Sequence, residues 1–326
     1  MFFLLWVSGA IPPLEVSQTR LVCQLTGRGS DGVVGQDAAI ILPWKNKILL
    51  FFGDTKLSTG KMIPNSMAET TDFRAGDCVD LEYLTDADGV AREPLKKEGK
   101  EATVWIHSVF SDGEDIYAYY YTVSPHWPAE PATFGTGLAR SSDGGKTFRR
   151  TALKFSPDSL FREIVFALFY REHLYLLLRN PRLGFGSIYL ARVRKRRWEN
   201  AGAYEVWDGK RWVKEEKKAQ ALFDNAGATS IQWNAYLGKW LAVYTVVFSG
   251  EKFLSEIWAR TADALTGPWS EPVVLLQCPS EPKREWGSCY SAQHNSVWDA
   301  ENGKIIYITA TDWLSYNVFL YEVFLK

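Results

Sequence analysis

The amino-acid sequence predicts an all-β fold, a five-bladed β-propeller whose last blade is completed by a strand from the N-terminus. Helical periodicity is scarce, and short β-rich runs alternate with turn residues. One outline recurs five times: a strand with a polar start, a short turn and a strongly apolar second strand. The five units are 36–55, 105–122, 162–178, 230–247 and 291–310. Their starts lie roughly 57 to 69 residues apart, which suits four-stranded blades with long loops.

A third strand repeats in three of the units, as the triplets that end at Arg140, Arg192 and Arg260. The turn after the first triplet, residues 141–148, reads Ser-Ser-Asp-Gly-Gly-Lys-Thr-Phe, which fits the Asp box of sialidase-like propellers. Asp143 can accept N–H bonds within such a turn, and its glycines allow positive φ. We therefore expect Asp143 to be structural.

The ends of the chain are expected to close the ring. The last unit supplies only three strands, 291–299, 304–312 and 316–325, and the run 19–25 has no unit of its own. Pairing this run with the last unit would remove open sheet edges. A sixth blade would need a unit within 56–104, where Gly, Asp, Glu and Lys dominate. We interpret that segment as a long loop over one face, and we expect one propeller domain over 19–326.

The N-terminal residues 1–10 are apolar but too short to span a bilayer. They resemble the end of a secretory signal without its basic start, so 1–18 is interpreted as the remnant of a leader or as a plain buried segment. The four cysteines form no C-x-x-C pair, which argues against a zinc or redox motif. Cys278 and Cys289 could bridge a loop if the protein is exported to the periplasm or the cell exterior, as we expect.

Composition limits the partners. A net charge of −1 argues against nucleic acid. The chain has 14 Trp, 15 Tyr and 18 Phe, which fits a large β core, while a few of these rings could stack on sugars. We expect a carbohydrate partner and no membrane span.

Polar residues at the starts of the five first strands are expected to meet near the propeller axis. They are Gln36, Asp37, His107, Arg162, Glu163, Gln232, Trp233, Gln293 and His294. Two carboxylates in one cavity are what glycoside hydrolysis needs, because one must be ionised and the other protonated. A turn-capping role for Asp37 and a surface ion pair for Glu163 are the structural alternatives.

Roles can be assigned on this basis. Asp37 is predicted to be the base that positions water, and Glu163 the acid. Asp54 is the third candidate, but it follows the second strand, which we expect to end away from Asp37. The remaining polar residues would bind hydroxyl groups or tune the acids. No cofactor is expected, because no metal-ligand spacing is present; a cation on the axis would be structural.

Several short motifs resemble a known family. They are Gly35-Gln36-Asp37, Phe51-Phe52-Gly53-Asp54-Thr55, residues 230–240, residues 264–269 and Tyr290-Ser291-Ala292-Gln293-His294. In this order they resemble a bacterial family of five-bladed propellers long listed as of unknown function, some of whose members are endo-D-arabinanases. More remotely, the chain looks like the arabinanase, β-xylosidase and fructosidase superfamily.

The resemblance implies a first-blade base at Asp37. The remoter superfamily implies a third-blade acid at Glu163, and the closer family implies a pair of Asp37 and Asp54. Gly-Gln-Asp stands where Gly-Thr-Asp is expected, and 56–104 departs from the family pattern. We therefore predict a glycoside hydrolase acting on a furanoside or a wall polysaccharide of the arabinan kind. A lectin-like carbohydrate-binding propeller is the alternative, and a protein-interaction propeller is a third reading.

Overall fold

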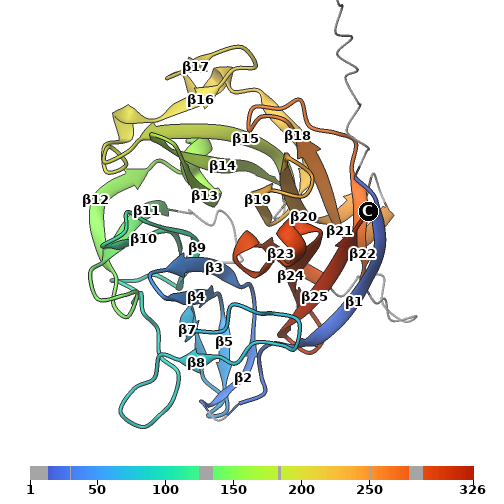
Figure 1. Cartoon of the computed structure of the whole chain (residues 1–326). Helices are drawn as coiled ribbons and strands as arrows, with labels where there is room; N and C mark the ends of the chain where they lie inside the picture. The colour runs from blue at the N-terminus through green and yellow to red at the C-terminus, as the bar shows by residue number, and fades with distance from the viewer. Residues whose placement is uncertain (1–13, 30, 125–134, 183–184, 250–251, 279–288) are drawn as a thin grey trace, which may run out of the picture.

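A computed structural model describes residues 14–29, 31–124, 135–182, 185–249, 252–278 and 289–326. It confirms the predicted all-β five-bladed propeller, with the blades arranged around a central axis (Figure 1). Most of the proposed leader, residues 1–13, lies outside the described residues. Strand β1 begins at Val16, three residues before the predicted start of the domain at 19.

Each blade is an antiparallel sheet whose strands follow one another outward from the axis. Blade I contains β3 (Ile40–Trp44), β4 (Lys47–Phe52), β7 (Ser66–Thr70) and β8 (Glu82–Tyr83). Blade II contains β9 (Thr103–Ser111), β10 (Ile116–Val123), β11 (Gly135–Ser141) and β12 (Arg149–Phe155). Blade III contains β13 (Ile164–Tyr170), β14 (His173–Arg182), β15 (Phe185–Arg194), β16 (Glu205–Trp207) and β17 (Trp212–Val213), with β18 (Ala221–Ala226) also paired to β15.

Blade IV contains β19 (Thr229–Asn234), β20 (Lys239–Ser249), β21 (Lys252–Ala262) and β22 (Val273–Gln277). Blade V contains β23 (Cys289–His294), β24 (Ile305–Asp312), β25 (Asn317–Leu325) and β1 (Val16–Gln24). A small separate sheet holds β2 (Val33–Gln36), β5 (Thr55–Leu57) and β6 (Met62–Ile63). Short 3-10 turns are η1 (Leu160–Arg162), η2 (Ala201–Ala203), η3 (Glu216–Lys218), η4 (Ser296–Trp298) and η5 (Glu301–Gly303).

The apolar second strands are buried on both faces. In β4, Leu49 and Phe51 pack toward blade II, whereas Ile48, Leu50 and Phe52 pack toward blade V. Successive side chains of a strand point to opposite faces, so a strand between two neighbouring blades must be apolar throughout. Five buried clusters of this kind fill the five spaces between blades.

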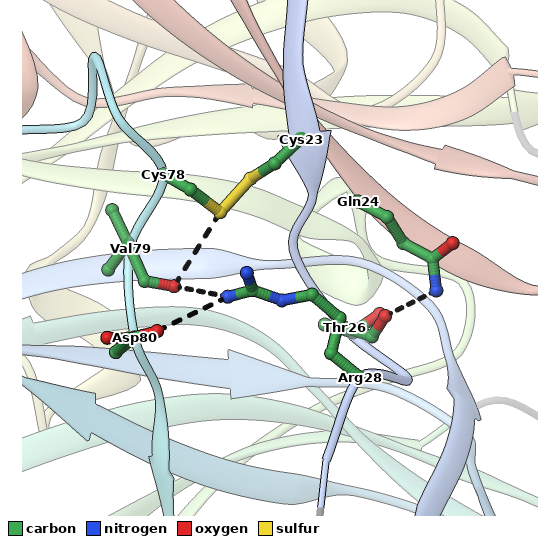
Figure 2. Close-up of a disulfide and its surroundings, with 7 residues drawn as sticks. All are labelled: Cys23, Gln24, Thr26, Arg28, Cys78, Val79 and Asp80. Atoms are coloured by element: carbon green, nitrogen blue, oxygen red, sulfur yellow. Dashed lines mark hydrogen bonds and ion pairs between the residues drawn. A yellow bond between two sulfur atoms is a disulfide. The ribbon is translucent and has the colours of Figure 1, made fainter.

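The ring closes as the sequence predicts. Strand β1 pairs antiparallel with β25 along its length, from the pair of Val16 with Leu325 to the pair of Gln24 with Phe319 (Figure 1). A disulfide between Cys23 and Cys78 then joins β1 to the loop that follows β7 of blade I (Figure 2). The disulfide therefore fastens the closing strand β1 to blade I, while strand pairing holds β1 to β25. Cys278 and Cys289 form the second disulfide.

The interpretation of 56–104 as a long loop was wrong. This segment holds β7 and β8, the outer strands of blade I, together with most of β5 and all of β6. The sequence did not predict strand β7, because Met67 is its only large apolar residue. Its small neighbours Ser66 and Ala68 are nevertheless fully buried against β4.

The turn 141–148 has the predicted structural role. A carboxylate oxygen of Asp143 accepts bonds from the Ser141 hydroxyl (2.7 Å) and the Thr147 N–H (2.9 Å). Gly145 has a φ of +85°, and a Cβ there would meet Phe51 and Met67 of blade I. The ring of Phe148 also contacts Phe51, with centroids 5.7 Å apart, so this turn ties blade II to blade I.

Candidate active site

A cavity of about 310 Å³ lies at the end of the axis where the first strands of the blades begin. All five blades contribute to it. Its polar lining includes Asp37, Asp54, Trp105, His107, Arg179, Thr245, Tyr290 and Gln293. Three residues of the predicted constellation, Asp37, His107 and Gln293, thus share one cavity with Asp54.

Asp37 and Asp54 are neighbours, contrary to the expectation that Asp54 would lie away from Asp37. The Asp37 N–H donates to the Asp54 carbonyl oxygen (3.3 Å), and the Gly53 N–H donates to the Asp37 carbonyl oxygen (2.9 Å). The reason is the hairpin itself: β4 runs antiparallel to β3, so it returns to the end of the blade where β3 began. Each carboxylate therefore faces the same cavity.

Gly53 makes this approach of the two acids possible. A Cβ at Gly53 would lie 2.3 Å from Oδ1 of Asp37, far inside ordinary van der Waals contact. The Gly53 backbone does not have positive φ, so the requirement is for space. Glycine at this position lets the backbone pass directly behind the Asp37 carboxylate.

Asp37 is held in a poorly solvated place. The Tyr290 hydroxyl donates to its Oδ2 (3.2 Å), and Tyr316 also bonds its side chain. Burial, and next the negative charge of Asp54, raise the pKa of Asp37 to about 7, although the two tyrosine bonds act in the opposite direction. Asp37 can therefore keep a proton close to neutral pH.

Asp54 has a different set of contacts. The indole Nε1–H of Trp105, from blade II, donates to its Oδ1 (2.8 Å). Burial raises the pKa of Asp54, and the Trp105 bond partly offsets this. A hydrogen bond to an ionised carboxylate favours the charged form. The pair thus combines one acid that retains its proton with one whose charge is supported by a neutral donor.

His107 lines the cavity as a neutral side chain. Its ring stacks against Tyr121 with centroids 3.9 Å apart. Burial, and then the positive charge of Arg179, lower the pKa of His107 to about 3. A neutral imidazole has one donor and one acceptor nitrogen, which suits contact with a hydroxyl group.

Glu163 does not line the cavity; its partner Arg179 does. The two form an ion pair with 7% and 6% of their respective surfaces exposed. The backbone N–H of Arg179 also donates to the Glu163 carbonyl oxygen (3.1 Å). This bond corresponds to the one in blade I from the Gly53 N–H to the Asp37 carbonyl oxygen. Arg179 was missed by the sequence reasoning. The ends of the second strands, which face the same end of the axis as the starts of the first, would have indicated both Arg179 and Asp54.

The other predicted binding residues lie elsewhere. Gln36 is fully buried and bonds the hydroxyls of Thr55 and Ser66, so it supports the backbone next to Asp37. Arg162 bonds Asn180 and the Pro157 carbonyl in a separate surface depression.

Gln232 and His294 lie at the opposite end of the axis, in a second cavity of about 440 Å³, because their positions fall late in β19 and β23. Trp233, the residue after Gln232, is 46% exposed, and its ring contacts that of Trp240. Gln293 borders both cavities.

In the part of the chain that the structure describes, no group of three or more His, Cys, Asp or Glu side chains is placed to hold a metal ion. No helix among the same residues has the length and apolar character needed to cross a membrane.

Several solved structures that share this fold are named as glycoside-cleaving enzymes. The GH32 β-fructofuranosidase of Bombyx mori superposes with a TM-score of 0.56 at 14% identity, covering 92% of this chain and 61% of that one. The exo-β-1,3-galactanase of Phanerochaete chrysosporium, solved with β-1,3-galactotriose, gives 0.57 at 14% identity, covering 93% and 64%. The GH62 α-L-arabinofuranosidase domain of Coprinopsis cinerea gives 0.50 at 10% identity, covering 96% and 97%.

These likenesses show a shared fold. The chain spans less than two thirds of the length of the first two enzymes. A search of curated proteins finds no match. A family model, in contrast, matches residues 29–322, from before β2 into β25. The chain therefore belongs to the family described as a domain of unknown function, DUF4185.

Proposed function

We propose that this protein is a glycoside hydrolase that cleaves a furanoside polysaccharide of the arabinan kind. The observation that carries the proposal is the pair of carboxylates, Asp37 and Asp54, that share one cavity and have raised pKa values. Paired acids with different proton affinities are the usual equipment for cleaving a glycosidic bond. A sugar-binding module would have no need to bury two acids side by side.

The contacts favour a division of labour that differs from the one predicted from sequence. Asp37 keeps its proton to about pH 7, which suits the acid that protonates the leaving glycosidic oxygen. Asp54, supported by Trp105, suits the carboxylate that takes a proton from water as the water oxygen attacks the anomeric carbon. One proton leaves water and one reaches the leaving sugar, so the pair ends with its proton moved from Asp37 to Asp54.

Glu163 has a supporting place in this proposal. Its ion pair fixes the guanidinium of Arg179 at the cavity wall, and Arg179 in turn helps to keep His107 neutral. Arg179, His107 and Gln293 are then the groups that bind sugar hydroxyls. Glu163 acts through Arg179 as a positioning residue.

The furanoside substrate is supported by two considerations. The structural neighbours include enzymes named for fructofuranosides and arabinofuranosides. The sequence motifs that contain Asp37 and Asp54 resemble those of endo-D-arabinanases. The two disulfides further support an exported protein, since such bonds persist in oxidising compartments.

The test is a panel of D-arabinan, L-arabinan, fructan and galactan, assayed for new reducing ends. We expect the wild type to release ends from a furanose polymer and both Asp37→Asn and Asp54→Asn to lose that activity. Asp88→Asn replaces an exposed acid that does not line the cavity; it is the matched control and should retain the activity. Equal product from Asp37→Asn and wild type would remove the carboxylate pair from the mechanism. Binding to a polymer without any cleavage would instead favour the lectin-like alternative.

A further inference from the structure

Trp313 is an exposed aromatic side chain that contacts Tyr290, a residue of the candidate active-site wall. Its exposed fraction is 60%, the highest among the large hydrophobic side chains of the described residues, and the adjacent Leu314 is 40% exposed. Its ring lies against Tyr290, with centroids 5.1 Å apart and planes at 68°. Tyr290 lines the cavity and bonds Asp37. A single side chain therefore separates the exposed indole from a proposed catalytic acid.

The turn that carries Trp313 is held firmly. The Asp312 carboxylate accepts bonds from the Ser315 N–H (2.8 Å) and the Ser315 hydroxyl (2.7 Å), and the Tyr316 N–H donates to the Asp312 carbonyl oxygen (2.9 Å). These bonds close the connection between β24 and β25. The indole is thus presented by a fixed loop, which limits the entropy lost on binding.

The same turn is fastened to the segment that bears Asp37. The Gln36 N–H donates to the Tyr316 carbonyl oxygen (2.6 Å), and the Ala38 N–H donates to the hydroxyl of Thr311 (2.9 Å). Tyr316 also bonds the Asp37 side chain. One rigid unit therefore positions both the proposed acid and the exposed ring, so their spacing is fixed.

We propose that Trp313 is a sugar-stacking platform that binds a neighbouring ring of the polysaccharide whose bond is cleaved at Asp37 and Asp54. Large aromatic faces with their surroundings open to solvent suit the apolar C–H face of a sugar ring. The apolar area here, one indole and one leucine, is too small for a stable protein interface, which needs about 1,200 Å² or more in total. The inference rests on the proposed function and extends it: the enzyme prefers long chains over short ones.

The experiment compares Trp313→Ala with wild type on oligosaccharides from the disaccharide to the octasaccharide of the polymer cleaved in the panel above. We expect KM for the longer oligosaccharides to rise about tenfold, equivalent to about 1.4 kcal/mol, with kcat and the disaccharide kinetics nearly unchanged. Trp313→Phe should recover part of the loss because it retains a ring. Tyr236→Ala, which removes a ring 43% exposed in the turn at the far end of β19, is the matched control.

A second readout separates this inference from the proposed function. Binding of the same polymers is measured by calorimetry, using Asp37→Asn alone and combined with Trp313→Ala. If no polymer is cleaved but Trp313→Ala weakens binding, the hydrolase proposal fails and the platform stands. If Trp313→Ala leaves the binding and the KM for long oligosaccharides unchanged, or if neither protein binds any polymer, the platform is refuted.

Discussion

Replacing Gly53 by alanine should disable the candidate site while the fold remains intact. A Cβ at this position would lie 2.3 Å from Oδ1 of Asp37, whereas ordinary contact begins at about 3.4 Å. Asp37 would have to move by roughly 1 Å, and a displacement of that size can reduce the rate about 100-fold.

The assay is release of reducing ends from the polymer identified in the panel, with the melting temperature recorded for each protein. We expect Gly53→Ala to lose about two orders of magnitude in kcat/KM. The matched control is Gly29→Ala, because a Cβ at Gly29 meets only Asp31 at ordinary distances of 3.7 and 3.9 Å. A Gly53→Ala protein that is folded and within twofold of wild-type activity would refute the claim that Asp37 must occupy its observed place.

Three further predictions concern the charges and the closure of the ring. The folded-state pKa of Asp37, about 7, exceeds its ordinary value of 3.8, so the folded protein binds more protons between these pH values and its stability falls as pH rises through them. The change in the free energy of unfolding that Asp37→Asn causes, relative to wild type, should therefore be more stabilising at pH 8 than at pH 4, by up to about 4 kcal/mol in urea titrations. The same change at both pH values would contradict this. Glu163→Gln should lower stability by about 3 kcal/mol or more, because the Arg179 charge would be left buried without its partner. In the pH profile of Glu163→Gln, kcat/KM should still fall above about pH 7, because Asp37 is the proposed acid. If this fall at high pH disappeared, Glu163 would be the acid instead. The double replacement Cys23→Ser and Cys78→Ser should lower the free energy of unfolding by about 4 kcal/mol, since the bond closes a loop with a sequence separation of 55; a change below about 1 kcal/mol would show that the bond adds little to the strand pairing that holds β1.

The sequence alone predicted the number of blades and the closure of the ring. Repeated pairs of a polar-start strand and an apolar strand predict blades because a strand buried between two blades must be apolar on both faces, as β4 is. The missing outer strand of the last unit likewise predicts closure by the N-terminal run, because an open edge would otherwise remain. Short outer strands such as β7 were missed, since five residues with one large apolar side chain carry little periodicity.

The membership of the site depended on the tertiary structure. The rule that polar residues at the starts of first strands meet on the axis correctly predicted that Asp37, His107 and Gln293 share one cavity. The same rule wrongly included Gln232 and His294, which lie late in their strands and reach the opposite end of the axis. Asp54 and Arg179 come from the ends of second strands, and hairpin pairing returns these ends to the cavity. Which acid holds a proton is decided by burial, by Tyr290 and by Trp105, groups that are distant in sequence. Local patterns determine strands and their order; the depth, contacts and charge of each side chain arise only when five blades meet.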